Sequence, residues 1–272
     1  MKLQINNNVF FHLETIESLI CKHEQITKVK CDEITLNLHQ TTDHTFLMYI
    51  LNKYKNVKLG SGPADYHIHA TCYNRDIQQI NTIDKNHFFI CHDFNEETKK
   101  NDNVFYLTPL AGKNYIKPNI LPLSPNIKTP HPVYVIQGNI SGGRRNYNLP
   151  IKILENTKDL KYQLKFIGRG SGLPAELLND ARVVHAANLS FIDFHYCFAD
   201  VYCVLPSLTK QTHPQYYTNK LTSSMSYISG FDLPCIIDTE LQSIYNLDNA
   251  YTFEKEEDLV STFIKSHEDF YA

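Results

Sequence analysis

The sequence has no apolar run that approaches the roughly 20 residues a membrane-spanning helix needs. Its first residues, MKLQINNNVFFHLETI, lack the basic start and apolar core of a signal peptide, so we expect no export signal. Charge of one sign is not in excess either, because 26 basic and 29 acidic residues give a net charge of -3. No general field therefore attracts nucleic acid or an anionic membrane, and local groups must hold any anionic ligand. We expect a cytoplasmic protein with neither a membrane span nor a nucleic-acid partner.

Closely spaced cysteine pairs are missing as well. No Cys-x-x-Cys motif and no histidine spacing typical of a zinc site occurs, so we expect no metal and no bound cofactor. Most cysteines are flanked by apolar, strand-like residues, which favours buried, reduced thiols over disulfides and gives no catalytic cysteine. The seven cysteines are Cys21, Cys31, Cys72, Cys91, Cys197, Cys203 and Cys235.

Alternating strand-like and helix-like segments predict an α/β fold. In the first half, the strand-like segments EITLNLH, ADYHIHATCY, HFFICHDF and NVFYLTP are interrupted by the helix-like HTFLMYILNKY at 44–54. Such alternation predicts a mostly parallel sheet with helices between its strands. The four strand-like segments occupy residues 33–39, 64–73, 87–94 and 103–109.

A proline-studded passage, KPNILPLSPNIKTPHPV, separates this half from the next. It can sustain neither a helix nor a central strand, so we interpret residues 118–132 as an interdomain linker. The chain length of 272 residues also predicts roughly two domains at about 150 residues each. We therefore expect α/β domains of similar size at residues 1–125 and 133–272.

The second half repeats the alternation. Strands are predicted at 133–140, 163–170, 182–187 and 200–206, with helices around 148–157, 174–180 and 190–197. Ligands of open α/β sheets bind beyond the carboxyl ends of the strands. Gly138, Gly168 and residues 186–188 are therefore expected to converge on one crevice.

The stretch TNKLTSSMSYISGFDLPCIID at 218–238 predicts a helix followed by a buried strand. The helix is expected from about Lys220 to Ser229, because Gly230 accepts the left-handed conformation that ends a helix and Pro234 prevents its resumption. Cys235 then begins a short apolar strand. A last helix is predicted at about 255–269.

The order of motifs in the second half resembles that of GT-B glycosyltransferases, specifically the GT4-like group (glycosyl transferases group 1). The segments that carry the resemblance are IQGNISGGRR, FIGRG, ADVYCVLPS and NKLTSSMSYISGFDLPCII, in that order. The resemblance covers residues 133 to about 260, together with HFFICHDF in the first half. It implies two Rossmann-like domains facing each other across a cleft, with the nucleotide sugar on the second domain and the acceptor on the first.

The GNISGGRRN loop is the expected diphosphate site. Glycines after an apolar strand let a ligand approach the backbone, and arginine side chains suit phosphate oxygens. The family has an arginine directly after the first glycine and a lysine several residues later, where this chain has Asn139 and Arg144. Gly138, Asn139, Arg144 and Arg145 are thus predicted to bind the donor diphosphate. A basic surface turn that caps the next helix is the alternative.

Lys220 is the second predicted diphosphate ligand. At the start of a helix its charge opposes the helix dipole, which favours an anion bound beside it. The resembled family places this lysine against the donor phosphates. A solvated surface lysine is the alternative.

The resemblance also implies the nucleoside and sugar contacts. The family carries two glutamates, one near the donor sugar and one on the ribose, and here Gln215 and Ser223 stand in their places. Both can bind a hydroxyl, but neither brings a full negative charge. The residues predicted to bind nucleoside and ribose are Gly168, Arg169, Ala187, Asn188, Leu221 and Ser223, and Gln215 is predicted to bind the donor sugar.

His92 and Asp93 are the predicted catalytic residues. They follow an apolar strand and resemble the His-Asp often found at the corresponding strand end of the family. A neutral histidine near the sugar could orient hydroxyls while the diphosphate leaves. A plain strand end and helix cap is the alternative.

The sequence thus predicts a glycosyltransferase that moves a sugar from a nucleotide-diphosphate sugar to a glycan or another hydroxyl. Retention follows from the resemblance, and cationic side chains are expected to neutralise the diphosphate without a metal. A non-catalytic binding subunit of the same shape and a DNA-modifying glucosyltransferase are the alternatives. The base, the sugar, the acceptor and the oligomeric state stay open.

Overall fold

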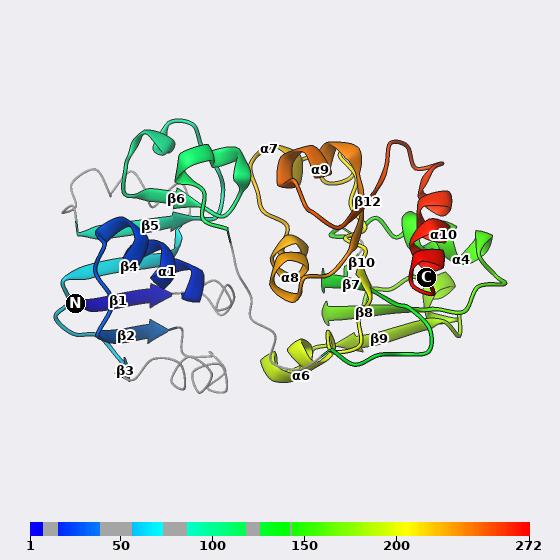
Figure 1. Cartoon of the computed structure of the whole chain (residues 1–272), viewed down its shortest axis with the longest axis horizontal. Coiled ribbons are helices and arrows are strands. Elements are labelled where there is room, and N and C mark those ends of the chain that lie inside the picture. The colour runs from blue at the N-terminus through cyan, green and yellow to red at the C-terminus, as the bar shows by residue number, and fades with distance from the viewer. Residues whose placement is uncertain (8–15, 39–55, 73–85, 118–125, 142) are drawn as a thin grey trace. The chain divides into compact units, whose positions relative to one another are not determined.

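The computed structural model describes residues 1–7, 16–38, 56–72, 86–117, 126–141 and 143–272 (Figure 1). The chain divides into two units, the first formed by Met1–Ile120 with Thr218–Leu221 and the second by Leu121–Tyr217 with Thr222–Ala272. The sequence analysis assigned all of residues 133–272 to the second domain, so it did not predict that Thr218–Leu221 belong to the first unit. Residues 118–125 of the proline-rich stretch lie outside the described residues, so its role as a linker stays a prediction.

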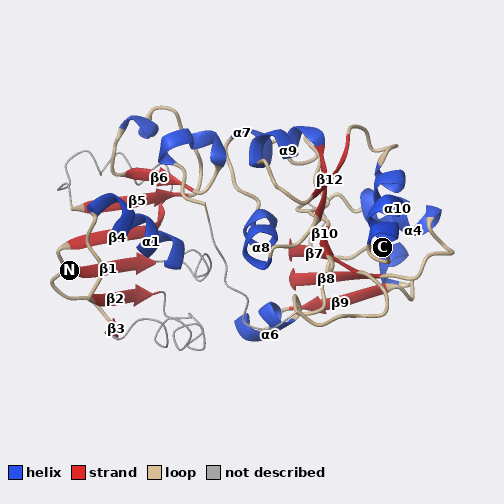
Figure 2. Ribbon diagram, viewed as in Figure 1, coloured by secondary structure: helices blue, strands red, loops and turns tan. Residues whose placement is uncertain are grey.

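The first unit is built on a six-stranded parallel sheet with the strand order β3-β2-β1-β4-β5-β6 (Figure 2). The segments predicted as strands contain β2, β4, β5 and β6, whereas β1, α1 and β3 were not predicted. The helix-like segment 44–54 lies outside the described residues. The elements are β1 Lys2–Asn7, α1 Ile16–Thr27, β2 Glu33–Leu38, β3 Val57–Leu59, β4 Tyr66–Cys72, β5 His87–Cys91, β6 Val104–Tyr106 and the 3-10 helices Thr98–Lys100 and Pro109–Asn114.

The second unit has its own six-stranded parallel sheet, in the order β12-β11-β10-β7-β8-β9. Its predicted strands are present, whereas α7, α9 and β12 were not predicted, and the last helix begins at Leu259 rather than at about 255. The elements are β7 Val133–Asn139, α4 Asn148–Asn156, β8 Gln163–Arg169, α5 Ala175–Leu178, β9 Val183–Ala187, α6 Phe191–Tyr196, β10 Cys203–Val204, α7 Gln215–Thr218, α8 Ser223–Phe231, β11 Cys235–Asp238, α9 Thr239–Tyr245, β12 Ala250–Phe253 and α10 Leu259–Asp269.

Both sheets have the strand order of a Rossmann fold. When the strands are numbered within each unit, the first sheet has the order 3-2-1-4-5-6, and the second has the same order read from its other edge. The predicted α/β class with two Rossmann-like units is therefore confirmed. The strand order reverses between β1 and β4 in the first unit and between β7 and β10 in the second, and such switch points are where ligands of this fold bind.

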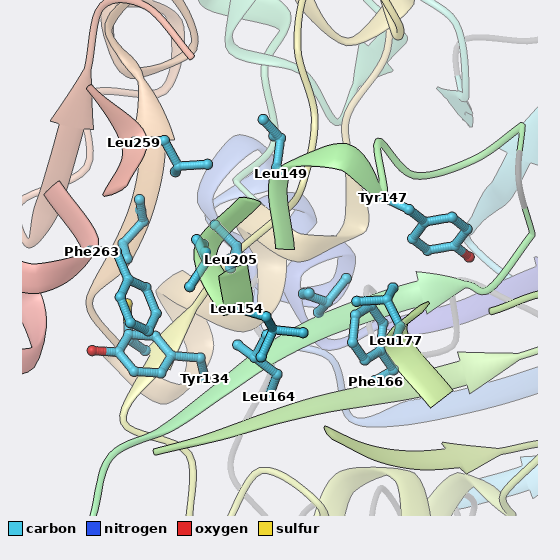
Figure 3. Packing of buried hydrophobic residues seen from close by; sticks show 14 of the residues in the cluster. Tyr134, Tyr147, Leu149, Leu154, Leu164, Phe166, Leu177, Leu205, Leu259 and Phe263 are labelled. Carbon is cyan, nitrogen blue, oxygen red and sulfur yellow. The ribbon is translucent and has the colours of Figure 1, made fainter. Parts of the chain in front are cut away.

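One face of the second sheet packs on α4, α5 and α10. Tyr134 and Phe166, which are fully buried, point into this core from β7 and β8 (Figure 3). Phe263 of α10 lies against Tyr134, with ring centroids 4.4 Å apart, and against Tyr162 at 4.9 Å. Burial of these large side chains contributes about 1.5 to 3 kcal/mol each relative to exposure, so this core fixes the sheet whose strand ends are described below.

A group of aromatic side chains surrounds His195 of α6. The His195 ring lies 5.7 Å from that of Tyr227 and 6.1 Å from that of Phe231, both on α8. Burial lowers the pKa of His195 to about 4, because the charged imidazolium would lose its hydration there. The histidine is therefore neutral in the folded protein above that pH.

Helix α8 differs from its prediction at both ends. It begins at Ser223, not at Lys220, and it continues through Gly230 to Phe231. The left-handed residue that ends it is Asp232, with φ 52°. Aspartate tolerates this conformation better than most residues, which is why the glycine was not needed for it.

The cysteines are all free thiols. Cys72, Cys91, Cys203 and Cys235 are buried, as expected of most of them, whereas Cys21 is exposed. Burial raises the pKa of Cys235 to about 12, so its thiol stays protonated.

Replacement of Phe263 by alanine should destabilise the second unit by about 3 to 5 kcal/mol, because it leaves a cavity between α10 and the sheet. Urea unfolding followed by circular dichroism measures this loss. Tyr196→Ala is the matched control, since the Tyr196 side chain is 53% exposed and should cost far less. Equal losses in the two variants would contradict the assigned core.

The buried His195 should make the second unit less stable in acid. Its folded pKa lies below the ordinary value of 6.5, so the unfolded chain binds the extra proton and stability falls as the pH drops from about 6.5 towards 4. Between pH 7 and pH 5 the contribution is about 2 kcal/mol. His195→Phe should flatten the pH dependence of the unfolding free energy by this amount, and an unchanged slope would be inconsistent with a buried neutral histidine.

Candidate functional site

The carboxyl ends of β7, β8 and β9 lie side by side in the second unit. Gly138 is the register partner of Gly168, which in turn pairs with Ala187. Asn188 follows β9 with a left-handed φ of 57°, and its amide donates to the Gly168 carbonyl at 2.7 Å. Residues that the sequence predicted to converge therefore do so at one edge of the sheet.

The glycines at this edge are required by close contacts within the protein. Gly138 has φ 126°, and a Cβ atom on it would lie 1.9 Å from Nη2 of Arg145. A Cβ atom on Gly168 would lie 1.7 Å from the carbonyl oxygen of Gly138. The position that a side chain at residue 138 would take is thus occupied by the Arg145 guanidinium group.

The two adjacent arginines have different surroundings. Arg145 is only 6% exposed, and it donates from Nη2 to the Gln137 carbonyl and from Nη1 to the Arg144 carbonyl at 2.6 Å. Burial lowers the pKa of Arg145, and the neighbouring Tyr216 offsets part of this effect. Arg144 is exposed. Of the two adjacent arginines, only Arg144 therefore has a solvent-exposed side chain, and the predicted contact of Arg145 with a diphosphate stays a prediction.

Gln137 joins the end of β7 to the start of α8. Its buried side-chain amide donates to the hydroxyl of Ser223 at 3.2 Å, and its Oε1 accepts from the hydroxyl of Ser224 at 3.2 Å. Ser223, a predicted ribose ligand, thus has an internal partner. The predicted sugar ligand Gln215 is half-buried at the first residue of α7.

The loop after β10 is tied to the loop after β7. The Ser207 hydroxyl donates to the Asn146 carbonyl at 2.7 Å, and the Asn146 amide donates to the Ser207 carbonyl at 2.9 Å. His213, near the end of this loop, is buried, and its Nδ1 lies 2.7 Å from the Thr212 hydroxyl. Burial lowers the pKa of His213, and the nearby Arg145 lowers it further.

Sequence reasoning missed this group of buried polar residues at the switch point. Gln137 stands in an apolar strand, and Asn146, Ser207 and His213 stand in loops. A polar residue inside a strand pattern was the one available signal, and it did not identify the partners.

In the first unit, His92 and Asp93 directly follow β5. The His92 amide donates to the Cys72 carbonyl at 2.9 Å, which continues the pairing with β4. Asp93 forms an antiparallel bridge with Lys220, whose Nζ lies 3.1 Å from Oδ1 of Asp93. Leu221, a predicted nucleoside ligand, belongs to the same first unit. The helix-dipole argument for Lys220 is wrong, because α8 begins at Ser223.

Three histidines stack on β4 and β5. The His69 Nε2 and His87 Nδ1 atoms lie 3.0 Å apart, and the rings of His67 and His87 are stacked with centroids 4.5 Å apart. Burial and the two neighbouring imidazoles lower the pKa of His69 to about 4.

Over the residues that the structure describes, no group of three or more potential ligands is arranged to hold a metal ion. In the same part of the chain, no helix has the length and apolarity to cross a membrane.

Comparison with known proteins identifies the fold. No family model and no curated protein sequence matches this chain. A glycosyltransferase from Rickettsia africae is 11% identical, with a TM-score of 0.53 over 97% of this chain and 87% of that one. An O-GlcNAc transferase variant from Thermobaculum terrenum is 11% identical, with a TM-score of 0.51 over 98% of this chain and 60% of that one.

A putative UDP-N-acetylglucosamine 2-epimerase from Listeria monocytogenes is also similar, at 11% identity and a TM-score of 0.50 over 97% of this chain and 87% of that one. At this identity the likeness shows the fold alone. That fold is the GT-B fold, which is built of two Rossmann domains, in agreement with the two parallel sheets described above.

Gly138→Ala should disturb this edge, because the new methyl group displaces the Arg145 guanidinium and the backbone keeps a φ that alanine avoids. We expect a loss of about 2 kcal/mol or more in the unfolding free energy of the second unit. Gly143→Ala is the matched control, since nothing lies within 4 Å of its added Cβ atom. If both variants unfold at the wild-type urea concentration, Arg145 does not occupy the assigned place.

Proposed function

We propose that this protein is a glycosyltransferase that moves a sugar from a nucleoside-diphosphate sugar to a hydroxyl acceptor, with the donor bound by the second unit. The observation that carries the proposal is the edge of the second sheet. The carboxyl ends of β7, β8 and β9 lie side by side there, next to the switch point. Gly138 and Gly168 lie at the ends of β7 and β8, and Asn188, whose φ is left-handed, follows β9. Arg144 is exposed on the loop that follows β7. A GT-B fold with such an edge suits a nucleotide whose diphosphate lies over backbone amides.

The diphosphate is proposed to contact Gly138, Asn139 and Arg144. The side chains of Asn139 and Arg144 are exposed, so they can reach a ligand without rearrangement. Arg145 has a different task in this proposal. Its guanidinium group packs against Gly138 and donates a hydrogen bond to the Gln137 carbonyl, which keeps the loop backbone in one conformation.

The nucleoside is proposed to lie beyond β8 and β9, against Gly168, Arg169, Ala187 and Asn188. The Asn188 side chain accepts from the Gly170 amide at 3.1 Å, which holds the two strand ends together. Gln215 and Ser223 stay proposed contacts for the sugar and the ribose. Because Ser223 already bonds to Gln137, it would have to share its hydroxyl with the ribose.

In the proposed reaction the bond between the sugar and the diphosphate breaks as the acceptor oxygen bonds to the sugar carbon with retention, and the proton of the acceptor hydroxyl passes to the leaving diphosphate. The diphosphate gains negative charge, which Arg144 stabilises without a metal. His92 and Asp93 of the first unit are the proposed catalytic pair, and the acceptor is a glycan or another hydroxyl. Binding energy at the diphosphate serves the reaction because the charge there grows in the transition state.

A non-catalytic nucleotide-sugar-binding subunit is the second candidate. Two observations favour it. Neutral Gln215 and Ser223 stand where the resembled family has carboxylates, and the Ser223 hydroxyl already accepts a hydrogen bond from Gln137. Release of free sugar or nucleotide from the donor, measured with and without hydroxyl acceptors, separates the two candidates.

The proposed function is tested by a thermal-shift panel of UDP, GDP and ADP sugars. A ligand at 100 times its dissociation constant stabilises the folded protein by about 2.7 kcal/mol, which raises the melting temperature by a few degrees. UDP sugars are the first probes, because one of the similar structures is that of a putative UDP-N-acetylglucosamine 2-epimerase. No shift with any member of the panel would refute the proposal.

Arg144→Ala should weaken the binding of UDP about tenfold or more, and leave the binding of uridine nearly unchanged. The lost charge-assisted hydrogen bonds to phosphate are worth about 1.5 to 3 kcal/mol, and 1.4 kcal/mol corresponds to a factor of ten. Isothermal titration calorimetry with both ligands measures the difference. Lys158→Ala, which removes an exposed cation from the turn before β8, is the matched control and should bind UDP like the wild type. Equal weakening of UDP and uridine would contradict a phosphate role.

A further inference from the structure

The four residues Thr218–Leu221, here named the strap, pack with the first unit although the chain on both sides belongs to the second. Thr218 is the last residue of α7, and α8 starts two residues after the strap. The strap meets the first unit at the end of β5, where His92 and Asp93 lie.

Backbone contacts fix the strap in place. Asp93 and Lys220 form an antiparallel bridge, and the Phe94 amide donates to the Asn219 carbonyl at 2.7 Å. The strands of the sheet pair only in parallel over the described part of the first unit, so this antiparallel bridge is a separate addition at the strand end. Its effect is to hold the turn that follows His92.

The side chains add an ion pair to these contacts. Lys220 Nζ lies 3.1 Å from Asp93 Oδ1, and the two side chains are 31% and 24% exposed. The Oδ1 atom is shielded from solvent, and its approach to Lys220 is that of an ion pair rather than of a well-directed hydrogen bond. A shielded carboxylate oxygen has lost hydration, so a cation beside it compensates the charge.

We propose that Lys220 is a positioning residue for Asp93, and that the strap holds the His92–Asp93 turn in its place at the end of β5. The inference rests on the proposed function for the role of His92 and Asp93, but the contacts themselves do not. It assigns the charge of Lys220 to a carboxylate of the first unit instead of the donor diphosphate. Arg144 then supplies the cation for the diphosphate.

The test compares Lys220→Met, Lys220→Arg and Asp93→Asn with the wild type in two measurements. Amide hydrogen exchange, read by mass spectrometry, reports on Phe94 and on residues 218–221, and calorimetry reports on UDP binding. Lys113→Met is the control, because Lys113 and Asp102 form an exposed ion pair in the same unit, with Nζ and Oδ1 3.4 Å apart. Circular dichroism verifies that each variant is folded.

We expect Lys220→Met to speed exchange at Phe94 about tenfold or more, since the Asn219 carbonyl no longer stays beside that amide. Asp93→Asn should speed exchange at Phe94 by a similar factor. The variant that combines Lys220→Met with Asp93→Asn should exchange little faster than either single variant, because the two side chains belong to one contact. Lys220→Arg should restore most of the protection. The dissociation constant of UDP should stay within about twofold of the wild type in Lys220→Met, while turnover of a donor sugar falls without a change in its KM.

Two results would overturn the inference. Wild-type exchange at Phe94 in Lys220→Met would show that the lysine does not hold the strap. A tenfold loss of UDP affinity in that variant would assign Lys220 to the diphosphate, whatever happens to the exchange. If the wild-type protein bound no nucleotide at all, the proposed function would fail, and the exchange measurements would still decide whether Lys220 positions Asp93.

Discussion

The contact between the Arg145 guanidinium and the backbone of Gly138 determines the shape of the candidate site. The guanidinium occupies the volume of a side chain at position 138 and binds the Gln137 carbonyl. This contact requires glycine at 138, and the close approach of β8 to the same peptide requires glycine at 168. With the carbonyl of Gln137 held by Arg145, the side chain of Gln137 is left to bind the first residues of α8.

A buried arginine is costly unless hydrogen bonds replace its hydration. Here the carbonyls of Gln137 and Arg144 accept from it, and Tyr216 lies beside it. The loops after β7 and β10 are joined in addition by the reciprocal bonds of Asn146 and Ser207. A loop held by so many internal bonds has little conformational freedom to lose when a ligand binds, which favours tight binding of a rigid group such as a diphosphate.

The two units show how one strand order can carry different chemistry. Both sheets run 3-2-1-4-5-6, so both have a switch point at equivalent strands. The second unit presents exposed Arg144 and Arg169 at its strand ends, whereas the first has His92 and Asp93, with Lys220 paired to the carboxylate. Fold alone does not fix this difference, since the side chains at the strand ends set the charge.

The sequence by itself determined the elements whose signal is local. Apolar runs such as VYVIQ and CIID became β7 and β11, and their alternation with helices predicted two parallel sheets. It did not reveal β1, where the buried Gln4 and Asn7 break the apolar pattern, because their burial depends on partners elsewhere in the chain. Only the tertiary structure decided which of two adjacent arginines is buried, and that Lys220 meets Asp93. Such contacts join residues distant in sequence, and packing rather than local propensity selects them.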